Sequence, residues 1–427
     1  MKLIINFISK LGVDSVSRLI GFLTLPIITR ALGPEGYGLY SYLFVILSYF
    51  GFFVDFGYLS YGTNKLCEKV DSKLIIGKII SLQILTLIFT YSVLFIAGYF
   101  IFDSDKYLLL LIFSFTFITQ TFAIRYYYLA NNKLYYNSIS ELAGQLIYAA
   151  LIFLVFMNYS SVTLLIIFSV IQATVTSLFL FIPYIRKNHI RINLNLKENL
   201  KTLKEAYKLG LANKAEGITS SFIILSAGII LNEQAVGYYN ASNKIYLILL
   251  TVVQGLSYTL MPVLLKSVKK NEERNVNKLS LIFYMYLFTG IILSLLTYFF
   301  SDTIISVMFG EKFSESAMIL KLFSITILLW PMVMFSGLVI LAFNRYNYIL
   351  IISVTSMVLS LIFSLIFINL FGITGTGMVL PFVAVGTIII SYVYLSKISK
   401  DENFRLNEIF YPANFAAGIK EMLRKSS

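Results

Sequence analysis

The sequence predicts an all-α, polytopic membrane protein of about twelve transmembrane helices, arranged as two parallel-repeated six-helix lobes around a central cavity. Composition is the first reason: 58% of the residues are hydrophobic and 13% are charged, whereas a soluble domain has roughly 25% charged residues. Apolar runs are the second. Residues 79–102, 279–301 and 322–344 contain no Asp, Glu, Lys or Arg and exceed the roughly 20 residues that a spanning helix needs. An internal repeat is the third.

Two longer stretches without charged side chains help to define the helices. Residues 142–185 and 346–396 are each too long for one crossing, and they are interrupted by polar or Gly-containing segments at 157–161 and 369–375. Each stretch is therefore predicted to form two helices joined by a short turn. The expected helices are 6–32, 38–62, 74–102, 107–131, 138–157, 160–185, 208–231, 236–264, 279–301, 314–343, 347–370 and 374–397.

Three short segments of the first half recur in the second half in the same order. Their offsets are 198, 199 and 212 residues. The pairs lie six helices apart, and an even number of helices preserves orientation in the membrane, so a parallel repeat is predicted. The pairs are Lys10-Leu11-Gly12 with Lys208-Leu209-Gly210, Gly38-Leu39-Tyr40 with Gly237-Tyr238-Tyr239, and Leu129-Ala130-Asn131-Asn132-Lys133 with Leu341-Ala342-Phe343-Asn344-Arg345.

The repeat divides the chain into four expected parts. Residues 1–185 form an N-lobe, 186–207 a basic cytoplasmic linker, 208–397 a C-lobe and 398–427 a cytoplasmic or interfacial tail. Two such lobes leave a cavity at their interface, which is the usual place for the substrate site of a transporter.

The distribution of Lys and Arg predicts the orientation. If the N-terminus is cytoplasmic, the outer loops carry three of the 34 basic residues: Arg30, Lys106 and Lys312. Because Lys and Arg concentrate in cytoplasmic loops, both termini are predicted to be cytoplasmic, and the net charge of +13 follows mostly from topology. The basic stretch 186–208 is interpreted as an orientation signal that contacts anionic membrane lipids, and no nucleic-acid partner is expected.

Several functions are excluded by what the sequence lacks. Cys67 is the only cysteine and His189 the only histidine, so neither an internal disulfide nor a His/Cys metal site is expected. There is no Gly-rich phosphate loop for ATP hydrolysis, and no carboxylate cluster in a soluble domain that would suit a glycosyltransferase. The chain is therefore not expected to be an enzyme or to hold a cofactor.

Arg18 is the clearest candidate for a functional charge inside the membrane. Such a charge costs roughly 2.5–3.5 kcal/mol on insertion scales. Arg18 lies about 18 Å before Arg30 along one helix, so its side chain does not easily reach either membrane surface. Asp14 lies one turn away on the same helix face. Arg18 is interpreted either as a lumen residue that meets an anionic ligand or as the partner of Asp14 in a structural ion pair.

Three further basic residues are candidates for the substrate path. Lys214 lies in the expected helix that repeats the first one, and Glu216, two residues later, points to a different face. Asn213, Gly217, Ser220 and Ser221 form a small polar stripe beside Lys214, and this stripe is either a lumen wall or a close helix contact. Lys244 and Lys321 lie about two turns from a helix end. Each either lines the cavity or extends its long stem to the membrane surface.

A second group of charges lies near the inner ends of the expected helices. Asp55, Arg125 and Glu141 either line an inner vestibule or sit at the membrane surface. Asp14, Asp55 and Glu216 are also candidates for ion pairing or for coupling transport to an H⁺ or Na⁺ gradient.

Tyrosines gather near the same inner ends. The runs 126–128 and 135–136 consist of Tyr alone. They are interpreted as part of an aromatic belt at the membrane surface, with stacking against sugar rings as the alternative.

Residues 25–40, Leu-Pro-Ile-Ile-Thr-Arg-Ala-Leu-Gly-Pro-Glu-Gly-Tyr-Gly-Leu-Tyr, resemble the N-terminal signature of Wzx-type polysaccharide flippases. These proteins are the polysaccharide-transporter branch of the MATE-like (multidrug/oligosaccharidyl-lipid/polysaccharide) superfamily. Residues 237–244 and 308–313 are weaker matches, and helix number, length and repeat are similar over the whole chain.

The resemblance implies a function. Such a protein translocates an undecaprenyl-pyrophosphate-linked oligosaccharide repeat unit, of O-antigen (lipopolysaccharide) or a related surface polysaccharide, from the inner to the outer leaflet of the bacterial inner membrane by alternating access. It implies that Arg18 and Lys214 contact the pyrophosphate or an acidic sugar, and it includes Arg30 through the motif. A polysaccharide polymerase and a chain-length regulator are the protein partners it suggests.

Two other classes stay open. A MATE-type drug/cation antiporter shares the architecture but needs deep acidic residues, whereas the deepest charges here are mostly basic. A non-transporting scaffold of a polysaccharide-assembly complex is the third class.

Overall fold

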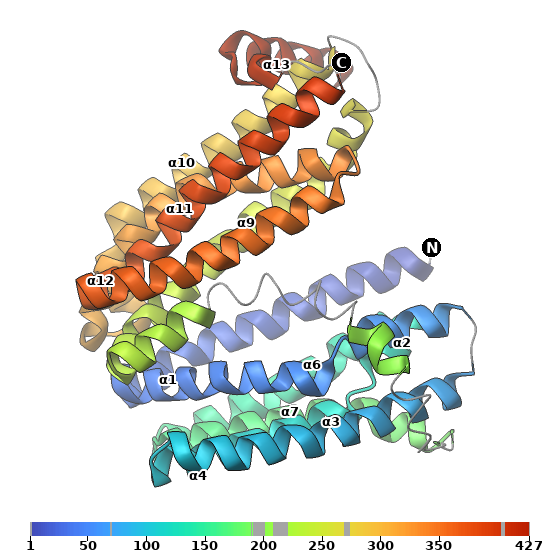
Figure 1. The fold of residues 1–427 in the computed structure, drawn as a ribbon, viewed down its shortest axis with the longest axis vertical. Helices are drawn as coiled ribbons and strands as arrows, with labels where there is room; N and C mark the ends of the chain where they lie inside the picture. The colour runs from blue at the N-terminus through green and yellow to red at the C-terminus, as the bar shows by residue number, and fades with distance from the viewer. Residues whose placement is uncertain are drawn as a thin grey trace. The chain divides into compact units, whose positions relative to one another are not determined.

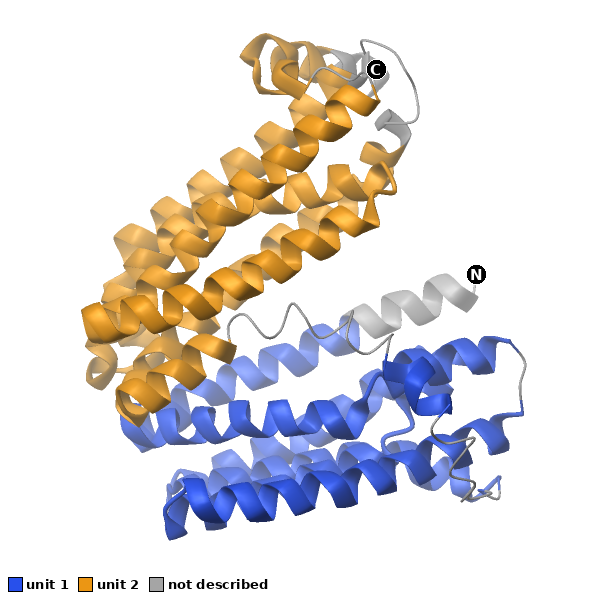
Figure 2. Ribbon diagram, in the orientation of Figure 1, with its two compact units in different colours: residues 1–214 blue, residues 215–427 orange. Residues whose placement is uncertain are grey.

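The computed structural model describes residues 2–68, 71–188, 190, 201–207, 221–268, 274–402 and 406–426. Its regular elements are helices throughout the described residues (Figure 1). The chain forms two compact units, residues 1–214 and 215–427 (Figure 2). Within the described residues, nine helices are long and apolar enough to cross a membrane. The prediction of an all-helical, polytopic membrane protein is therefore confirmed.

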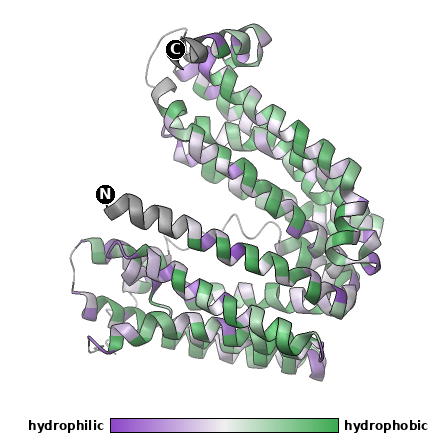
Figure 3. Cartoon of the chain, turned by 180° about the vertical axis from the view of Figure 1, so that it is seen from behind, coloured by the Kyte–Doolittle hydropathy of each residue, from purple (hydrophilic) through white to green (hydrophobic). Residues whose placement is uncertain are grey.

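The surface of the helices suits lipid. Figure 3 shows hydrophobic residues along most of each long helix and hydrophilic ones mainly at the ends and turns. Large apolar side chains lie uncovered, such as Phe100 with 80% and Leu154 with 74% of their surface exposed. In water this exposure would be unfavourable, but in a bilayer it is the expected state of a lipid-facing surface.

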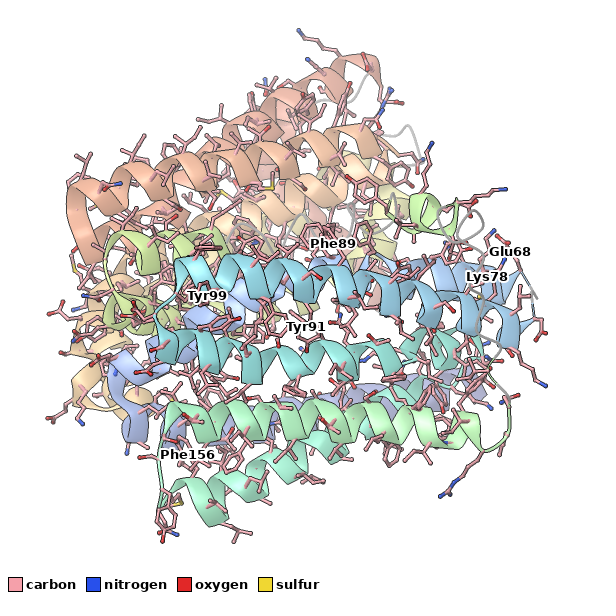
Figure 4. The ribbon with its side chains drawn as sticks, turned by 60° about the horizontal axis from the view of Figure 1, so that its bottom comes forward. Glu68, Lys78, Phe89, Tyr91, Tyr99 and Phe156 are labelled. Carbon is pink, nitrogen blue, oxygen red and sulfur yellow. The ribbon has the colours of Figure 1, made fainter. Side chains whose placement is uncertain are left out.

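The described part of unit 1 contains seven α-helices, a π-helical turn and a short helix at 201–207. These elements are α1 (Lys2–Asp55), α2 (Tyr58–Cys67), α3 (Ser72–Ile101), α4 (Ser104–Phe122), α5 (Arg125–Ala130), α6 (Leu134–Leu151), η1 (Ile152–Phe156) and α7 (Val162–Ile185). Tyr91 of α3 points toward α4 (Figure 4), where its hydroxyl donates a hydrogen bond to the Ser114 carbonyl at 2.9 Å. Such contacts join the helices into one bundle.

Helix α1 is divided at Gly33, where the backbone has φ 67° and ψ −178°. This conformation is open essentially to glycine alone. Pro34 begins the second arm, a position where its missing N–H costs nothing. The expected loop between residues 32 and 38 is therefore a single non-helical residue inside a continuous helix.

Two expected helices of unit 1 are each broken once more. The second arm of α1 ends at Asp55, and Phe56 and Gly57, both with positive φ, turn the chain into α2. The expected helix 107–131 ends at Phe122 and resumes as α5 at Arg125. The predicted break at 157–161 is confirmed, because η1 ends at Phe156 and the Ser161 side chain caps α7.

Part of the expected linker belongs to unit 1. Residues 201–207 form a helix whose Ala206 is fully buried against Tyr58, Ile76 and their neighbours. The chain between 190 and 201 lies outside the described residues.

Unit 2 is a bundle of long helices. After a helix at 221–230 come α9 (Glu233–Val268), α10 (Arg274–Phe309), η2 (Glu311–Phe313), α11 (Ser314–Ala342), α12 (Tyr346–Asp401), η3 (Leu406–Phe410) and α13 (Pro412–Ser426). The predicted break at 369–375 is again a single residue within a helix, Gly372 with φ 59°.

The tail packs on α10. The Tyr284 hydroxyl donates to the Phe410 carbonyl at 2.9 Å, and the Tyr284 and Phe415 rings lie 4.7 Å apart. The expected polar tail is thus helical, and its apolar side is attached to the unit.

Candidate functional site

A cavity of about 830 Å³ lies within unit 1. This volume falls in the range of roughly 300–1,000 Å³ that is usual for ligand pockets. Its walls come from α1 to α7, and its lining includes residues of both arms of α1. Along the second arm the cavity extends from Tyr40 to Asp55, about 22 Å at the rise of an α-helix.

Five candidate charges from the sequence line this one cavity: Asp14, Arg18, Asp55, Arg125 and Glu141. Arg18 is exposed and Asp14 is half-buried. Among the described residues no ion pair joins these two side chains, although they lie one turn apart. The structure therefore places carboxylates and guanidinium groups in the same space.

Arg125 and Glu141 form an ion pair across the cavity wall. The Arg125 Nη1 and Glu141 Oε1 atoms are 2.8 Å apart, and 43% and 44% of the two side chains is exposed. The break before α5 places Arg125 opposite α6, and the Asn137 side chain donates to the Arg125 carbonyl at 3.3 Å. No proline or glycine marks this break, so the sequence alone did not indicate the pair.

Four glutamines that the sequence analysis did not single out also line the cavity: Gln83, Gln120, Gln145 and Gln172. The chain contains six glutamines, so most of them gather here. The Gln172 amide donates to Gln145 Oε1 at 2.7 Å, which joins α6 to α7. The signal was present in the sequence, because polar side chains within spanning helices usually face a bundle interior.

Buried polar atoms in the cavity wall that have no hydrogen-bond partner among the described residues include Gln83 Oε1, Tyr126 OH and Ser177 Oγ. Their side chains are only 3–4% exposed. A buried polar group without a partner costs about 1–3 kcal/mol. Such atoms are expected where a ligand or water completes the bonding.

Aromatic rings line the cavity around Tyr40. The Tyr40 and Phe113 rings are stacked at 5.4 Å with an interplanar angle of 26°. The Tyr40 hydroxyl lies 3.0 Å from Ser169 Oγ, which fixes the ring against α7.

The other candidate residues lie elsewhere. Arg30 is exposed and does not line the cavity. In unit 2, Lys244 is exposed on α9, and Lys321 pairs with Asp302 at 2.7 Å. Lys214 and Glu216 lie outside the described residues, and no group of three His, Cys, Asp or Glu side chains in the described part could hold a metal ion.

The tyrosine runs are largely packed inside the protein. Tyr126 and Tyr128 are 3% and 4% exposed, and the Tyr128 hydroxyl donates to the Leu180 carbonyl at 2.8 Å. The prediction of an aromatic belt at the membrane surface is wrong for these two residues, because their rings are buried in the core of unit 1.

Residues 3–268 match the model of a family described as "Polysaccharide biosynthesis protein". The capsular polysaccharide biosynthesis protein CapF of Staphylococcus aureus is 25% identical over 404 residues, which cover 92% of this chain and 98% of the relative. A protein of Escherichia coli (strain K12) described as "Putative O-antigen transporter" is 20% identical over 336 residues, or 75% of this chain and 78% of the relative.

Two solved structures share the fold. The lipid II flippase MurJ in an inward closed conformation matches with a TM-score of 0.72 at 15% identity, over 98% of each chain. An inward-facing multidrug resistance MATE family transporter of the MOP superfamily matches with a TM-score of 0.66 at 14% identity, over 92% of this chain and 99% of the other. Because the family model matches more than half of its length, this multi-pass membrane chain belongs to the Polysaccharide biosynthesis protein family, and its fold is that of these two solved structures.

Proposed function

We propose that this protein is a flippase that carries an undecaprenyl-pyrophosphate-linked oligosaccharide repeat unit from the inner to the outer leaflet of the bacterial inner membrane by alternating access. The main support is a cavity lined by five charged and four glutamine side chains inside an otherwise apolar bundle. A glycan crossing a bilayer needs polar groups to replace water, whereas its polyprenyl tail remains in lipid. The descriptions of the relatives as capsular polysaccharide and O-antigen proteins support a surface polysaccharide as the product.

We further propose twelve crossings with both termini cytoplasmic. Gly33 and Gly372 each divide a 56-residue candidate span into two arms long enough to cross. The twelfth crossing is the one expected from the sequence at 208–231, of which the structure describes the apolar helix 221–230.

Roles for individual charges follow from the same proposal. Arg18, exposed at the cavity, is available for a charge-assisted hydrogen bond to the cargo, and Lys214, Lys244 and Lys321 are candidates for contacts with its anionic groups in the second half. Asp14 and Asp55 are candidates for coupling to an H⁺ or Na⁺ gradient, with Glu216 as the third. A polymerase and a chain-length regulator are the proposed protein partners.

One observation favours a second candidate function. Asp14, Asp55 and Glu141 all line the cavity, and carboxylates of this kind suit a drug/cation antiporter. The likeness in fold to a multidrug transporter is compatible with that alternative.

A gene deletion separates the two candidates. If the protein is the flippase, the deletion abolishes surface polysaccharide and lipid-linked repeat units accumulate on the inner leaflet, and a plasmid copy restores both. A deletion strain with normal polysaccharide and altered sensitivity to cationic drugs would overturn the flippase proposal in favour of the antiporter.

A further inference from the structure

We infer that the cavity of unit 1 is a subsite for the uncharged sugars of the cargo, and that the pyrophosphate binds elsewhere. This inference rests on the proposed function and specifies which part of the cargo this cavity recognises. It differs from the expectation, drawn from the sequence, that the charges inside the membrane are mostly basic and contact the pyrophosphate.

The charge balance of the cavity disfavours pyrophosphate. Its lining holds three carboxylates against two guanidinium groups, and one of these, Arg125, is already paired with Glu141 at 2.8 Å. A pyrophosphate would add further negative charge beside Asp14, Asp55 and Glu141, and like charges in a site of low dielectric repel strongly. A cargo group without net charge meets no such penalty.

The neutral polar groups of the wall match sugar hydroxyls. A carboxamide offers both donors and acceptors, and a hydroxyl offers one donor and two lone pairs. In the hydrogen bond from Gln172, Gln145 accepts through Oε1, so its Nε2 group takes no part in that bond. Gly21 lies next to Nε2, because a Cβ on Gly21 would be 3.3 Å from that atom. The absence of a side chain at Gly21 thus leaves this donor room.

The unpartnered atoms give the independent sign of a ligand. Gln83 Oε1, Tyr126 OH and Ser177 Oγ come from three different helices, yet all border the same cavity. Each is a neutral acceptor, and two of the three also donate. A ligand with several hydroxyl groups can donate to and accept from all of these atoms. A phosphate only accepts, so it can bond to the two hydroxyls but not to the Gln83 oxygen.

The shape of the cavity suits more than one sugar ring. It follows the second arm of α1 for about 22 Å at the rise of an α-helix. The half-buried Tyr40 ring, stacked on the buried Phe113 ring, offers an aromatic surface for the apolar face of a sugar ring. The geometry therefore points to a short chain of neutral sugars.

Protection of a thiol in the cavity tests the inference directly. In a Cys67→Ser background, Ala173→Cys places one thiol in the wall, and its rate of reaction with a water-soluble maleimide is measured on the purified full-length protein in nanodiscs. The probes are the oligosaccharide released by mild acid from the host's lipid-linked repeat unit and inorganic pyrophosphate. The wild-type chain, with its exposed Cys67 outside the cavity, is the control.

The expected result is that the released oligosaccharide slows labelling at position 173 several-fold, that pyrophosphate has no such effect, and that Cys67 reacts at one rate throughout. Protection by pyrophosphate, or by neither probe, overturns the subsite.

The substitution Gln83→Met is a second test, read out as the melting temperature of the purified protein and as transport in cells. It removes a side chain that has no hydrogen-bond partner among the described residues, so the melting temperature is expected to stay the same or rise. The transport rate is expected to fall about tenfold at limiting substrate, because a bond to the sugar is lost. The control, Gln254→Met, alters a glutamine of α9 outside this cavity and is expected to keep the wild-type rate.

Failure of the inference is distinguishable from failure of the proposed function. If deletion of the gene abolishes surface polysaccharide but Gln83→Met restores it fully, the sugar subsite is overturned and the flippase stands. If the deletion leaves polysaccharide intact, the proposed function itself is wrong.

Discussion

At the scale of single residues, the cavity shows that spacing on a helix does not decide pairing. Asp14 and Arg18 lie one turn apart, which favours an ion pair, yet in the structure no such pair forms between them and both side chains line the cavity. Arg125 and Glu141, which lie on different helices, do pair. Their half-exposed bond is of the kind that adds little stability, about 0–1 kcal/mol, so its position in the cavity is more informative than its strength.

Arg18→Ala tests the role of the uncovered guanidinium. We expect the variant to insert normally but to restore at most about a tenth of the wild-type surface polysaccharide, because one charge-assisted contact with the cargo contributes about 1.5–3 kcal/mol. Arg18→Lys should retain more activity, since it keeps the charge but loses the planar fork. Polysaccharide is measured in the complemented deletion strain and normalised to the membrane level of the protein.

The matched control is Lys187→Ala, which removes an exposed basic side chain outside the cavity. Full activity of Arg18→Ala at equal protein level would show that Arg18 has no role in transport.

At the scale of elements, the two longest helices are each divided by a single glycine. Gly33 and Gly372 have positive φ, whereas the backbone stays helical at Pro26, Pro331 and Pro381. The chain thus changes direction where the backbone needs glycine, and the prolines are tolerated within the bundle.

Gly33→Ala should therefore destabilise the protein. An L-residue in this backbone region costs about 1–3 kcal/mol, so we expect a melting temperature several degrees lower in a thermal-shift assay on the purified protein. Gly337→Ala is the control, because Gly337 is helical and a Cβ there would meet nothing within 4 Å. That variant is expected to match or exceed the wild type, and an equal fall in both would refute the backbone argument.

The sequence predicted the elements better than their contacts. Apolar runs and the polar segment at 157–161 identified most helices of the described residues, because lipid demands long uncharged spans. The breaks before α2 and α5 were not predicted, since tertiary packing rather than a strong local signal produces them. The candidate site was predicted in part: its charges were found from their cost in a membrane, but the glutamines were missed because they carry no charge.

At the scale of the whole molecule, the repeat has a counterpart in backbone geometry. Asn132 and Asn344, which lie 212 residues apart, both adopt the left-handed conformation, with φ of 55° and 57°. The hydrogen bonds around them recur at the same offset: Lys133 N to Tyr128 O, and Arg345 N to Ile340 O, at 2.8 and 3.2 Å. The aromatic contact of Tyr40 with Phe113 also has a parallel in that of Tyr239 with Phe323.

This parallel makes a prediction about pairs of variants. Asn132→Ala and Asn344→Ala should each lower stability by about 1 kcal/mol, because alanine is less tolerant than asparagine of the left-handed conformation that ends these helices. Asn132→Gly and Asn344→Gly should be close to neutral. The double alanine variant should lose the sum of the two single effects, since the sites lie in separate compact units and effects of distant sites usually add. The melting temperatures of the five variants measure these effects. A large effect at one position with none at the other would show that the two turns, although alike in geometry, do not stabilise their units equally.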